Sequence, residues 1–329
     1  MEAEFCDLCR DGNLDEIKQL LKNNAVNIHT TDERAFTNAC ISRNIEVVKF
    51  LIDYAISIDS PINIHVYNDW GFTNACRSEN TELVEFLLEH AASVDSPINI
   101  HINNERGFMN ACYSGNIELV KFLIDYATSI DSPVDIHAND EKGFRNACYA
   151  GNIELVKFLI EYAISIDSPI DIHANDEEGF RNVYTPENIG PTKFLIEYAV
   201  SIDSPIDIHT ENDCVFRNAC TYGGIGLVKY LIDYAVSINS PIDIHMKNNC
   251  GFRNACKNNN IEIIQLLISE SVFAPIKYLY DQHNKTGYIF NSDFTLDTPD
   301  IHSYETMLFQ TVDNKTPNKS YLDDNIGKL

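Results

Sequence analysis

The sequence predicts an all-α solenoid of about eight helix pairs joined by short extended hairpin loops. Two sets of residues that recur every 36 positions predict this fold class. They are the histidines His29, His65, His101, His137, His173, His209 and His245, and the phenylalanines Phe36, Phe72, Phe108, Phe144, Phe180, Phe216 and Phe252. A fixed period of this length is typical of a solenoid, in which each unit buries apolar surface only against its neighbours. We therefore expect one repeat array over residues 1–270 and a different segment over residues 271–329.

Composition limits the possible partners and compartments. The chain has 329 residues, 44% of them hydrophobic, and a formal net charge of −25. Such a surface disfavours nucleic acid as a partner, because affinity for phosphates comes mainly from Lys and Arg. The first residues are acidic and do not resemble a signal peptide, and no apolar run is long enough to span a membrane. We expect a soluble, intracellular, cytoplasmic protein with no membrane partner.

The ten cysteines do not predict disulfides. Six of them occupy one column of the repeat (Cys40, Cys76, Cys112, Cys148, Cys220 and Cys256). Equivalent positions of packed helices lie about 8–10 Å apart, whereas a disulfide joins Cα atoms about 4.4–6.8 Å apart. The column therefore predicts small buried thiols in a reducing compartment. The Cys6-x-x-Cys9 pair also suggests a redox or metal role, but Cys9 belongs to the structural column, which disfavours that role.

The first unit is an abbreviated cap, and the unit Gly143 to His173 is the clearest copy of the repeat. Residues 5–24 match the next unit at a spacing of 31 instead of 36, as expected of a capping repeat. In the clearest copy, Asp140 occupies a column of Asn and Asp, which suit a turn or a helix N-cap and tolerate left-handed backbone. A short helix, helix A, is expected from about Glu141 to Ala150 and is broken at Gly151.

A second helix, helix B, is expected from Ile153 to about Ala163. Its apolar residues form two stripes, which predicts that it is packed between neighbours, and Glu154, Lys157 and Glu161 are expected to face water. Ser168-Pro169 ends the helix. The unit around residues 177–199 is degenerate, because Pro186 is expected to shorten helix A, while Pro191 is tolerated in the first turn of helix B.

The repeat register is lost after Ser269. Residues 271–329 keep short apolar clusters and become polar from Asp313. We expect a C-terminal capping segment that covers the last repeat, followed by a partly disordered tail.

The order of a hairpin, a short helix, a turn and a longer helix resembles the ankyrin repeat. The resemblance is clearest in Gly151-Asn152-Ile153-Glu154-Leu155-Val156-Lys157-Phe158-Leu159-Ile160 and in Asp171-Ile172-His173. Gly143-Phe144-Arg145 replaces the family's Pro-Leu-His, and the period is 36 instead of 33. The composition, biased towards Asn, Ile and Asp, is also similar to arrays encoded by large (giant) DNA viruses, which would imply a viral protein of the host cell cytoplasm.

The uniform columns are interpreted as architecture. Zinc ligands must all lie about 2.0–2.3 Å from one ion, which excludes a metal site shared by histidines one unit apart. We expect these histidines to bond to the backbone between neighbouring hairpins. In other ankyrin proteins the corresponding residue can be hydroxylated, so modification stays open. The Asn column is also uniform, and uniformity favours architecture over recognition. No catalytic constellation, cofactor motif or metal set is found, so we predict a protein that is not an enzyme.

The candidate binding face consists of three columns on helix A that vary between units. Seven of the nine arginines of the chain lie in these columns, together with Trp and Tyr, a composition typical of interaction hot spots. The alternative is that these arginines only pair with acidic residues of adjacent units. The candidate partner-binding residues are Trp70, Arg77, Arg106, Met109, Tyr113, Lys142, Arg145, Tyr149, Arg181, Arg217, Arg253 and Lys257.

The sequence therefore predicts a non-enzymatic, monomeric scaffold. Its concave face of helices A and hairpins is expected to bind another protein through acidic or phosphorylated segments. In the alternative function the array holds a target while residues 271–329 recruit a second factor, such as a ubiquitin-ligase component. Residues 271–329 show no clear pattern for such recruitment.

Overall fold

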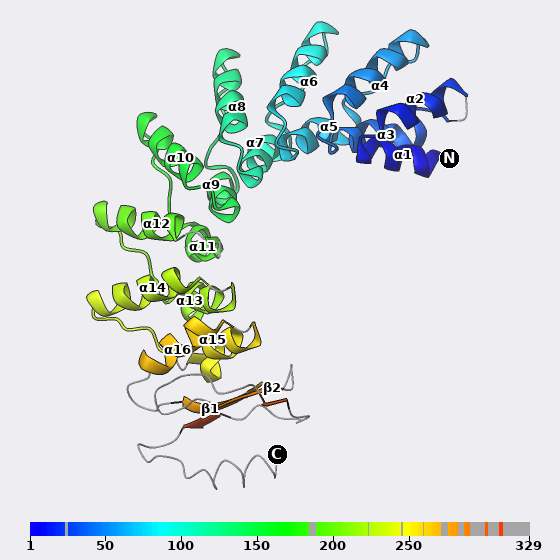
Figure 1. Ribbon diagram of the computed structural model, residues 1–329. Coiled ribbons are helices and arrows are strands. Elements are labelled where there is room, and N and C mark those ends of the chain that lie inside the picture. Colours follow the sequence, from blue (N-terminus) through cyan, green and yellow to red (C-terminus); the bar gives the residue numbers. More distant parts are fainter. Residues whose placement is uncertain are drawn as a thin grey trace. The chain divides into compact units, whose positions relative to one another are not determined.

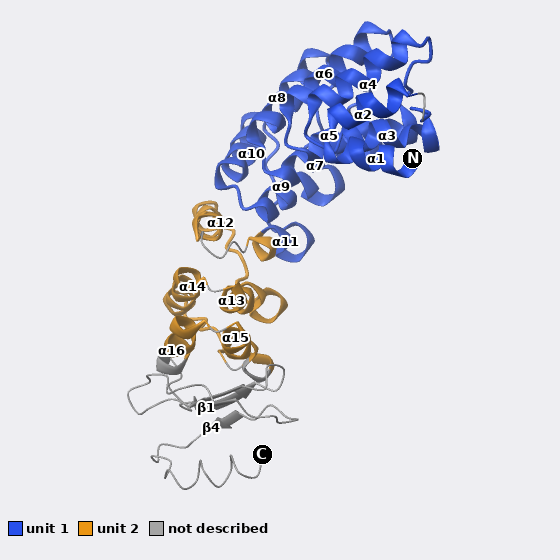
Figure 2. Cartoon of the chain, turned by 45° about the vertical axis from the view of Figure 1, so that its right-hand side comes forward, with its two compact units in different colours: residues 1–179 blue, residues 180–329 orange. Residues whose placement is uncertain are grey.

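The protein is described by a computed structural model over residues 1–23, 26–183, 189–222, 224–244, 246–258 and 260–270. It also describes the backbone of four short strands between residues 276 and 311. These residues fall into two compact units, unit 1 (residues 1–179) and unit 2 (residues 180–329), which are coloured separately in Figure 2. Sixteen helices in the described residues form eight successive pairs, which confirms the predicted all-α solenoid.

Unit 1 contains five complete helix pairs. The odd-numbered helices are the A helices and lie side by side in one layer, while the even-numbered B helices pack on them (Figure 1). The pairs are α1 (Glu2–Asp11) and α2 (Leu14–Lys22), α3 (Thr30–Ala39) and α4 (Ile45–Ser57), α5 (Val66–Arg77) and α6 (Thr81–Ser93), α7 (Ile102–Ser114) and α8 (Ile117–Ser129), and α9 (Ala138–Ala150) and α10 (Ile153–Ser165). Helix α11 (Ala174–Asn182) begins in unit 1 and ends in unit 2.

Unit 2 continues the same pattern and then changes to strands. Its helices are α12 (Gly190–Ser201), α13 (Thr210–Tyr222), α14 (Ile225–Ser237), α15 (Met246–Lys257) and α16 (Ile261–Glu270). Four antiparallel strands follow in the sheet order β3-β2-β1-β4, namely β1 (Ile276–Asp281), β2 (Thr286–Ile289), β3 (Asp300–Ile301) and β4 (Phe309–Thr311). Strands were not predicted in this segment, and β1 lies next to α15. The tail expected from Asp313 lies outside the described residues.

Six of the A helices, α3, α5, α7, α9, α11 and α13, begin with a left-handed turn of three residues. In α9 the residues Asn139, Asp140 and Glu141 have φ values of 56, 55 and 60°. A left-handed residue other than glycine costs about 1–2 kcal/mol, least for Asn and Asp. The prediction that the Asn/Asp column tolerates left-handed backbone is confirmed at Asp140. Regular helix therefore begins at Lys142, one residue later than expected.

The A helices interlock through a phenylalanine and a glycine. Phe108 is 2% exposed and Phe144 is 1% exposed. A Cβ atom built on Gly143 would lie 2.5 Å from Cε1 of Phe108, and one on Gly107 would lie 2.6 Å from Cε1 of Phe72. Where a glycine precedes the phenylalanine, at Gly71, Gly107, Gly143, Gly179 and Gly251, it leaves room for the ring of the preceding helix A, which sets how closely successive repeats approach.

The predicted helix boundaries are confirmed in the clearest unit. Gly151 ends α9 in the left-handed conformation, with φ 71°. The side chain of Asn152 then caps α10 by accepting hydrogen bonds from the backbone N–H groups of Glu154 and Leu155, at 3.1 and 3.2 Å. In the unit expected to be degenerate, α11 has 9 residues where α9 has 13, and Pro191 lies in the first turn of α12. Pro186, which was expected to shorten helix A, lies outside the described residues.

Candidate functional site

The variable positions of helix A share one side of each helix in unit 1. Trp70 and Arg77 are seven residues apart, which is about two helical turns, and both are exposed. The equivalent pairs on the other helices have the same spacing. They are Arg106 and Tyr113 on α7, Lys142 and Tyr149 on α9, and Arg34 on α3 with Ile41 in the turn just after it. We call this surface of α3, α5, α7 and α9 the helix A face.

Three successive repeats, with helices α5, α7 and α9, contribute to one exposed stack on the helix A face. The guanidinium of Arg77 lies 5.2 Å from the ring centroid of Tyr113. The rings of Tyr113 and Tyr149 are stacked, with centroids 5.2 Å apart and an interplanar angle of 15°. The two tyrosines remain 37% and 47% exposed. The predicted residues Arg77, Tyr113 and Tyr149 are thus brought together in a continuous surface of aromatic and cationic groups.

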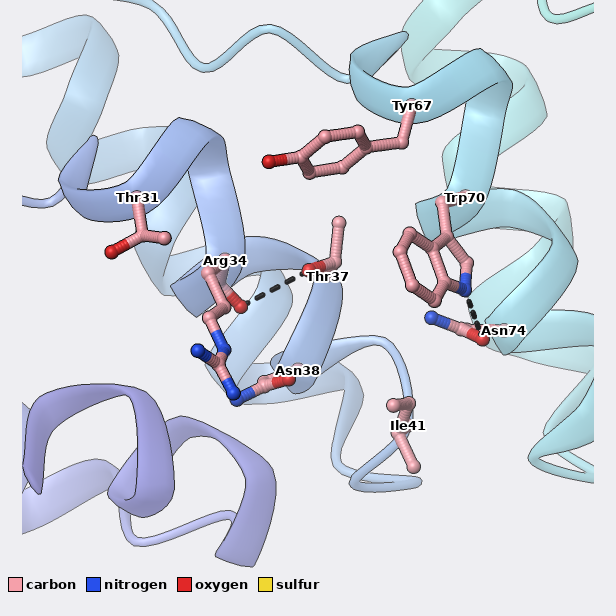
Figure 3. Close-up of a pocket in the computed structure, with 8 residues that line it drawn as sticks. All are labelled: Thr31, Arg34, Thr37, Asn38, Ile41, Tyr67, Trp70 and Asn74. Carbon is pink, nitrogen blue, oxygen red and sulfur yellow. Dashed lines mark hydrogen bonds between the residues drawn. The ribbon is translucent and has the colours of Figure 1, made fainter. Parts of the chain in front are cut away.

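A pocket of about 320 Å³ lies between α3 and α5 (Figure 3). Figure 3 shows Tyr67 and Trp70 on the α5 side and Arg34, Thr37 and Ile41 on the α3 side. The rings of Tyr67 and Trp70 meet edge to face, with centroids 5.7 Å apart.

The polar ends of both rings are already bonded. The Trp70 Nε1–H donates to Asn74 Oδ1 at 3.0 Å, and the Tyr67 hydroxyl donates to Asp32 Oδ2 at 3.2 Å. The wall formed by the two rings therefore presents apolar surface to the pocket.

The cations of the helix A face differ in whether they have an acidic partner. Within the described residues, Arg34, Arg77 and Arg106 form no ion pair with a carboxylate, although all three are exposed. In contrast, Lys142 Nζ lies 3.1 Å from Glu178 Oε1. The alternative interpretation, that the arginines of helix A only pair with acidic residues of adjacent repeats, therefore does not apply to Arg34, Arg77 and Arg106.

Arg145 occupies a buried position in the left-handed turn of α9. It is 6% exposed, and its Nε and Nη2 donate to the carbonyl oxygens of Asp140 and Asn139, at 2.8 and 2.7 Å. Its Nη1 bonds to Glu178 Oε2. Arg145 therefore has a local structural role, whatever it contributes to a partner.

Glu178 forms ion pairs with both cations of this cluster. Burial opposes ionisation of Glu178, but hydrogen bonds from Asn175 and Lys142 and the charges of Lys142 and Arg145 outweigh it and lower its pKa to about 2. Glu178 is therefore a carboxylate throughout the physiological range, and its negative charge offsets one of the two positive charges of Lys142 and Arg145.

The remaining predicted residues are dispersed. Met109 is half-buried on α7, and its carbonyl oxygen accepts a hydrogen bond from Asn146 Nδ2 at 2.8 Å. In unit 2, Arg181 pairs with Glu211, and Arg217 donates to the carbonyl oxygens of Asn212 and Glu211, both at 2.9 Å. Arg253 lies 3.4 Å from the carbonyl oxygen of Lys247, while Lys257 is exposed at the end of α15.

The repeated histidines connect neighbouring units through side chains. His137 Nδ1 lies 2.7 Å from Glu141 Oε1, and its Nε2 lies 2.8 Å from Ser168 Oγ in the next linker. Glu141 Oε1 also accepts the backbone N–H of Asp171 at 3.2 Å. An ionised carboxylate only accepts, so Nδ1 of His137 carries a proton and donates it to Glu141. The expected structural role is found, but the partners are mainly a buried carboxylate and a serine instead of the backbone.

The asparagine and cysteine columns are architectural. Asn110 Nδ2 donates to the carbonyl oxygen of Thr73 at 2.7 Å, which joins helix A of one unit to that of the unit before. The six cysteines of the repeated column are free and buried, as predicted. Burial raises the pKa of Cys40, Cys76, Cys112, Cys148 and Cys220. Burial also raises the pKa of Cys6, and of Cys9 to about 12, which disfavours a reactive thiolate in this pair.

Two further structural observations concern metals and membranes. The part of the chain that the structure describes contains no group of three or more His, Cys, Asp or Glu side chains placed to bind a metal ion. Among the same residues, no helix is long and apolar enough to cross a membrane.

Sequence reasoning did not identify the buried acids or the pocket. Glu105 and Glu141 are 5% and 6% exposed, although glutamate is rarely buried. The signal was an acidic residue four positions after each described histidine of the repeated column (Glu33, Asp69, Glu105, Glu141, Glu177 and Asp213). Tyr67 and Arg34 were not predicted as pocket residues, because the pocket forms only where residues of two adjacent repeats meet.

Comparison with known proteins gives the family. A family model described as ankyrin repeats (3 copies) matches residues 6–98 and 72–170, together half of the chain. No curated protein sequence matches significantly. Among solved structures, the human ASB11 ankyrin repeat domain matches with 19% identity and a TM-score of 0.38, covering 59% of this chain and 82% of that one. The matches described here do not support the viral origin that the composition suggested.

Proposed function

The chain belongs to the ankyrin-repeat family, and on this premise we propose that it is a protein-interaction module that binds a partner protein through the helix A face of unit 1. The family is generally non-catalytic, and no catalytic step is assigned to this chain. The proposed partner presents acidic or phosphorylated segments, because the accessible cations of this face are arginines that bind carboxylate and phosphate well.

The observation that carries the proposal is the stack of Arg77, Tyr113 and Tyr149. Its three side chains come from three successive units and remain accessible while they contact one another. Such a preformed array loses little side-chain entropy on binding. Tyr and Arg are also the residue types that most often dominate binding energy at protein interfaces.

The free cysteines support the proposed cellular setting. The chain has ten cysteines, and none forms a disulfide. Free buried thiols persist where glutathione and thioredoxin keep them reduced. We therefore place the proposed function inside the cell.

A peptide-display selection tests the proposed function. Random peptides are selected on the full-length protein, and the enriched clones are then measured on a variant with Arg77→Ala, Tyr113→Ala and Tyr149→Ala. Removal of the stack is expected to weaken binding of the enriched peptides by at least about tenfold, which corresponds to about 1.4 kcal/mol.

The matched control removes exposed apolar groups elsewhere on unit 1. Ile58, Ile130 and Ile166 follow the B helices and are 47%, 48% and 46% exposed, so their replacement by alanine removes similar apolar surface. This control is expected to bind the peptides as the natural chain does. If the control loses binding and the stack variant does not, the helix A face is not the binding surface.

A further inference from the structure

We propose that the helix A face of unit 1 recognises an extended acidic peptide with the pattern acid, two residues, apolar residue, two residues, acid. The two acids bind Arg34 and Arg106, and the apolar side chain enters the pocket against Tyr67 and Trp70. The inference rests on the proposed function and adds the chemical class and the spacing of the partner segment.

The pocket fits an apolar side chain that lies next to an anion. Its volume is about 320 Å³, enough for one large side chain. The apolar surface comes from Tyr67, Trp70 and Ile41, and the polar ends of both rings already have partners. Only Arg34 brings a positive charge to the lining. An apolar group therefore binds to the rings, and a neighbouring carboxylate binds to the guanidinium.

The charges along this face favour an anionic ligand in spite of the net charge of −25. Arg34 and Arg106 are exposed and form no ion pair within the described residues. The turn position that is Asp140 in α9 is Asn68 in α5 and Asn104 in α7. Asp32 is the exposed acid at this position of α3, and it accepts the hydroxyl of Tyr67. The acids of the turns in α5 and α7, Asp69 and Glu105, are buried and bonded to His65 and His101, so the exposed charges on these two helices are Arg77 and Arg106.

The distance between successive A helices sets the interval between the peptide residues that contact them. Arg34, Trp70 and Arg106 occupy the same repeat position in three successive A helices that pack against one another. Packed helices are about 8–10 Å apart, and an extended chain rises about 3.2–3.4 Å per residue. One unit therefore corresponds to about three peptide residues. The order arginine, tryptophan, arginine then requires acid, apolar and acid at intervals of three.

This pattern is the same in both chain directions. The peptide is therefore recognised by its acidic, apolar and acidic side chains in turn. It can bind with its backbone running in either direction. In unit 2, Arg181 and Arg217 already have acceptors of their own. The recognition surface is therefore confined to unit 1.

Synthetic peptides test the inference with the full-length protein. The probe is a fluorescein-labelled Gly/Ser peptide with glutamate, phenylalanine and glutamate at intervals of three residues. Two control peptides have the same composition at intervals of two and of four. Fluorescence polarisation is expected to show binding to the first peptide at least about tenfold tighter than to either control.

A charge exchange tests whether Arg34 binds an acidic residue of the peptide. Arg34→Glu is expected to weaken binding at least about tenfold, and a peptide with lysine in place of one glutamate is expected to recover most of the loss. Lys121→Glu, on the exposed side of α8, changes the net charge equally and is expected to have little effect. A further peptide with phosphoserine at the acid positions shows whether phosphate or carboxylate is preferred.

Equal binding of the three spacings, or no binding of any of them, overturns the inference. The same holds if Lys121→Glu weakens binding as much as Arg34→Glu, because the attraction is then not local. These results leave the proposed function intact if the display selection still depends on Arg77, Tyr113 and Tyr149. If that dependence is also absent, the proposed function fails with the inference.

Discussion

Arg145 Nε donates to the carbonyl oxygen of Asp140 at 2.8 Å, so the arginine bridges the left-handed turn that precedes its own helix. The side chain is buried and also bonds to Asn139 and Glu178. Arg106, one unit earlier, is exposed and has no ion pair within the described residues. Two arginines from one group of variable columns thus differ in what they do for the fold.

The first prediction separates these two arginines by stability. Arg145→Ala removes donors from the turn carbonyls and is expected to lower the free energy of unfolding of unit 1 by about 1–3 kcal/mol. Arg106→Ala is expected to change it by no more than about 0.5 kcal/mol. Urea denaturation followed by circular dichroism measures both. Equal losses in the two variants would contradict the structural role of Arg145.

The second prediction concerns pH. The pKa of Glu178 in the folded chain is about 2, below the value of about 4.3 for an unfolded glutamate. A depressed pKa stabilises the fold above the unfolded value, and this contribution is lost as pH falls towards 2. The difference in melting temperature between the natural chain and Glu178→Gln is therefore expected to be largest near neutral pH and to shrink between about pH 5 and 2.

Glu154→Gln is the control for that titration. Glu154 also lies 3.1 Å from a lysine, Lys157, but it is exposed, and exposed ion pairs contribute about 0–1 kcal/mol. The difference between the natural chain and this variant is expected to change little with pH. A difference of the same size for Glu154→Gln and Glu178→Gln would refute the assignment.

The third prediction concerns the histidine and acid pair that joins the units. His137→Ala and Glu141→Ala are each expected to destabilise the fold by about 1–3 kcal/mol, because the first leaves the buried carboxylate of Glu141 and the second the half-buried ring of His137 without one of its hydrogen-bond partners. The double variant is expected to lose less than the sum, with a coupling of about 0.5–3 kcal/mol. His90→Ala is the comparison, because His90 stacks on Phe86 at 6.0 Å without a carboxylate partner in the described structure. If the loss of unfolding free energy in the double variant equals the sum of the two single losses, His137 and Glu141 do not act as a coupled pair.

The fourth prediction concerns the contact between glycine and phenylalanine. A Cβ at Gly143 would lie 2.5 Å from Cε1 of Phe108, so Gly143→Ala is expected to cost about 1–3 kcal/mol through overpacking. Gly226 has only Ile189 Cγ2 nearby, at 3.9 Å, and Gly226→Ala is expected to stabilise its helix by up to about 1 kcal/mol. Thermal unfolding of both variants checks the sign. Stabilisation by Gly143→Ala would mean that the units can separate without cost.

The sequence by itself determined the repeat, the helix boundaries and the buried columns. The period of 36 residues, Gly151 at a helix end and the cysteine column are local or periodic signals, and each depends on one residue type at a fixed position. Turn-forming residues and apolar stripes specify the structure of only a few residues around them, so the structure they favour can be predicted without knowing the tertiary contacts.

Only the tertiary structure decided which variable residues are accessible. Arg145 and Arg106 both belong to the variable columns of helix A. Glu178 and the turn carbonyl oxygens surround Arg145, whereas Arg106 is exposed to solvent. The pocket between Arg34 and Trp70 likewise joins residues of different units. Burial and ion pairing depend on side chains that are distant in sequence, and a periodic pattern does not specify which of them meet.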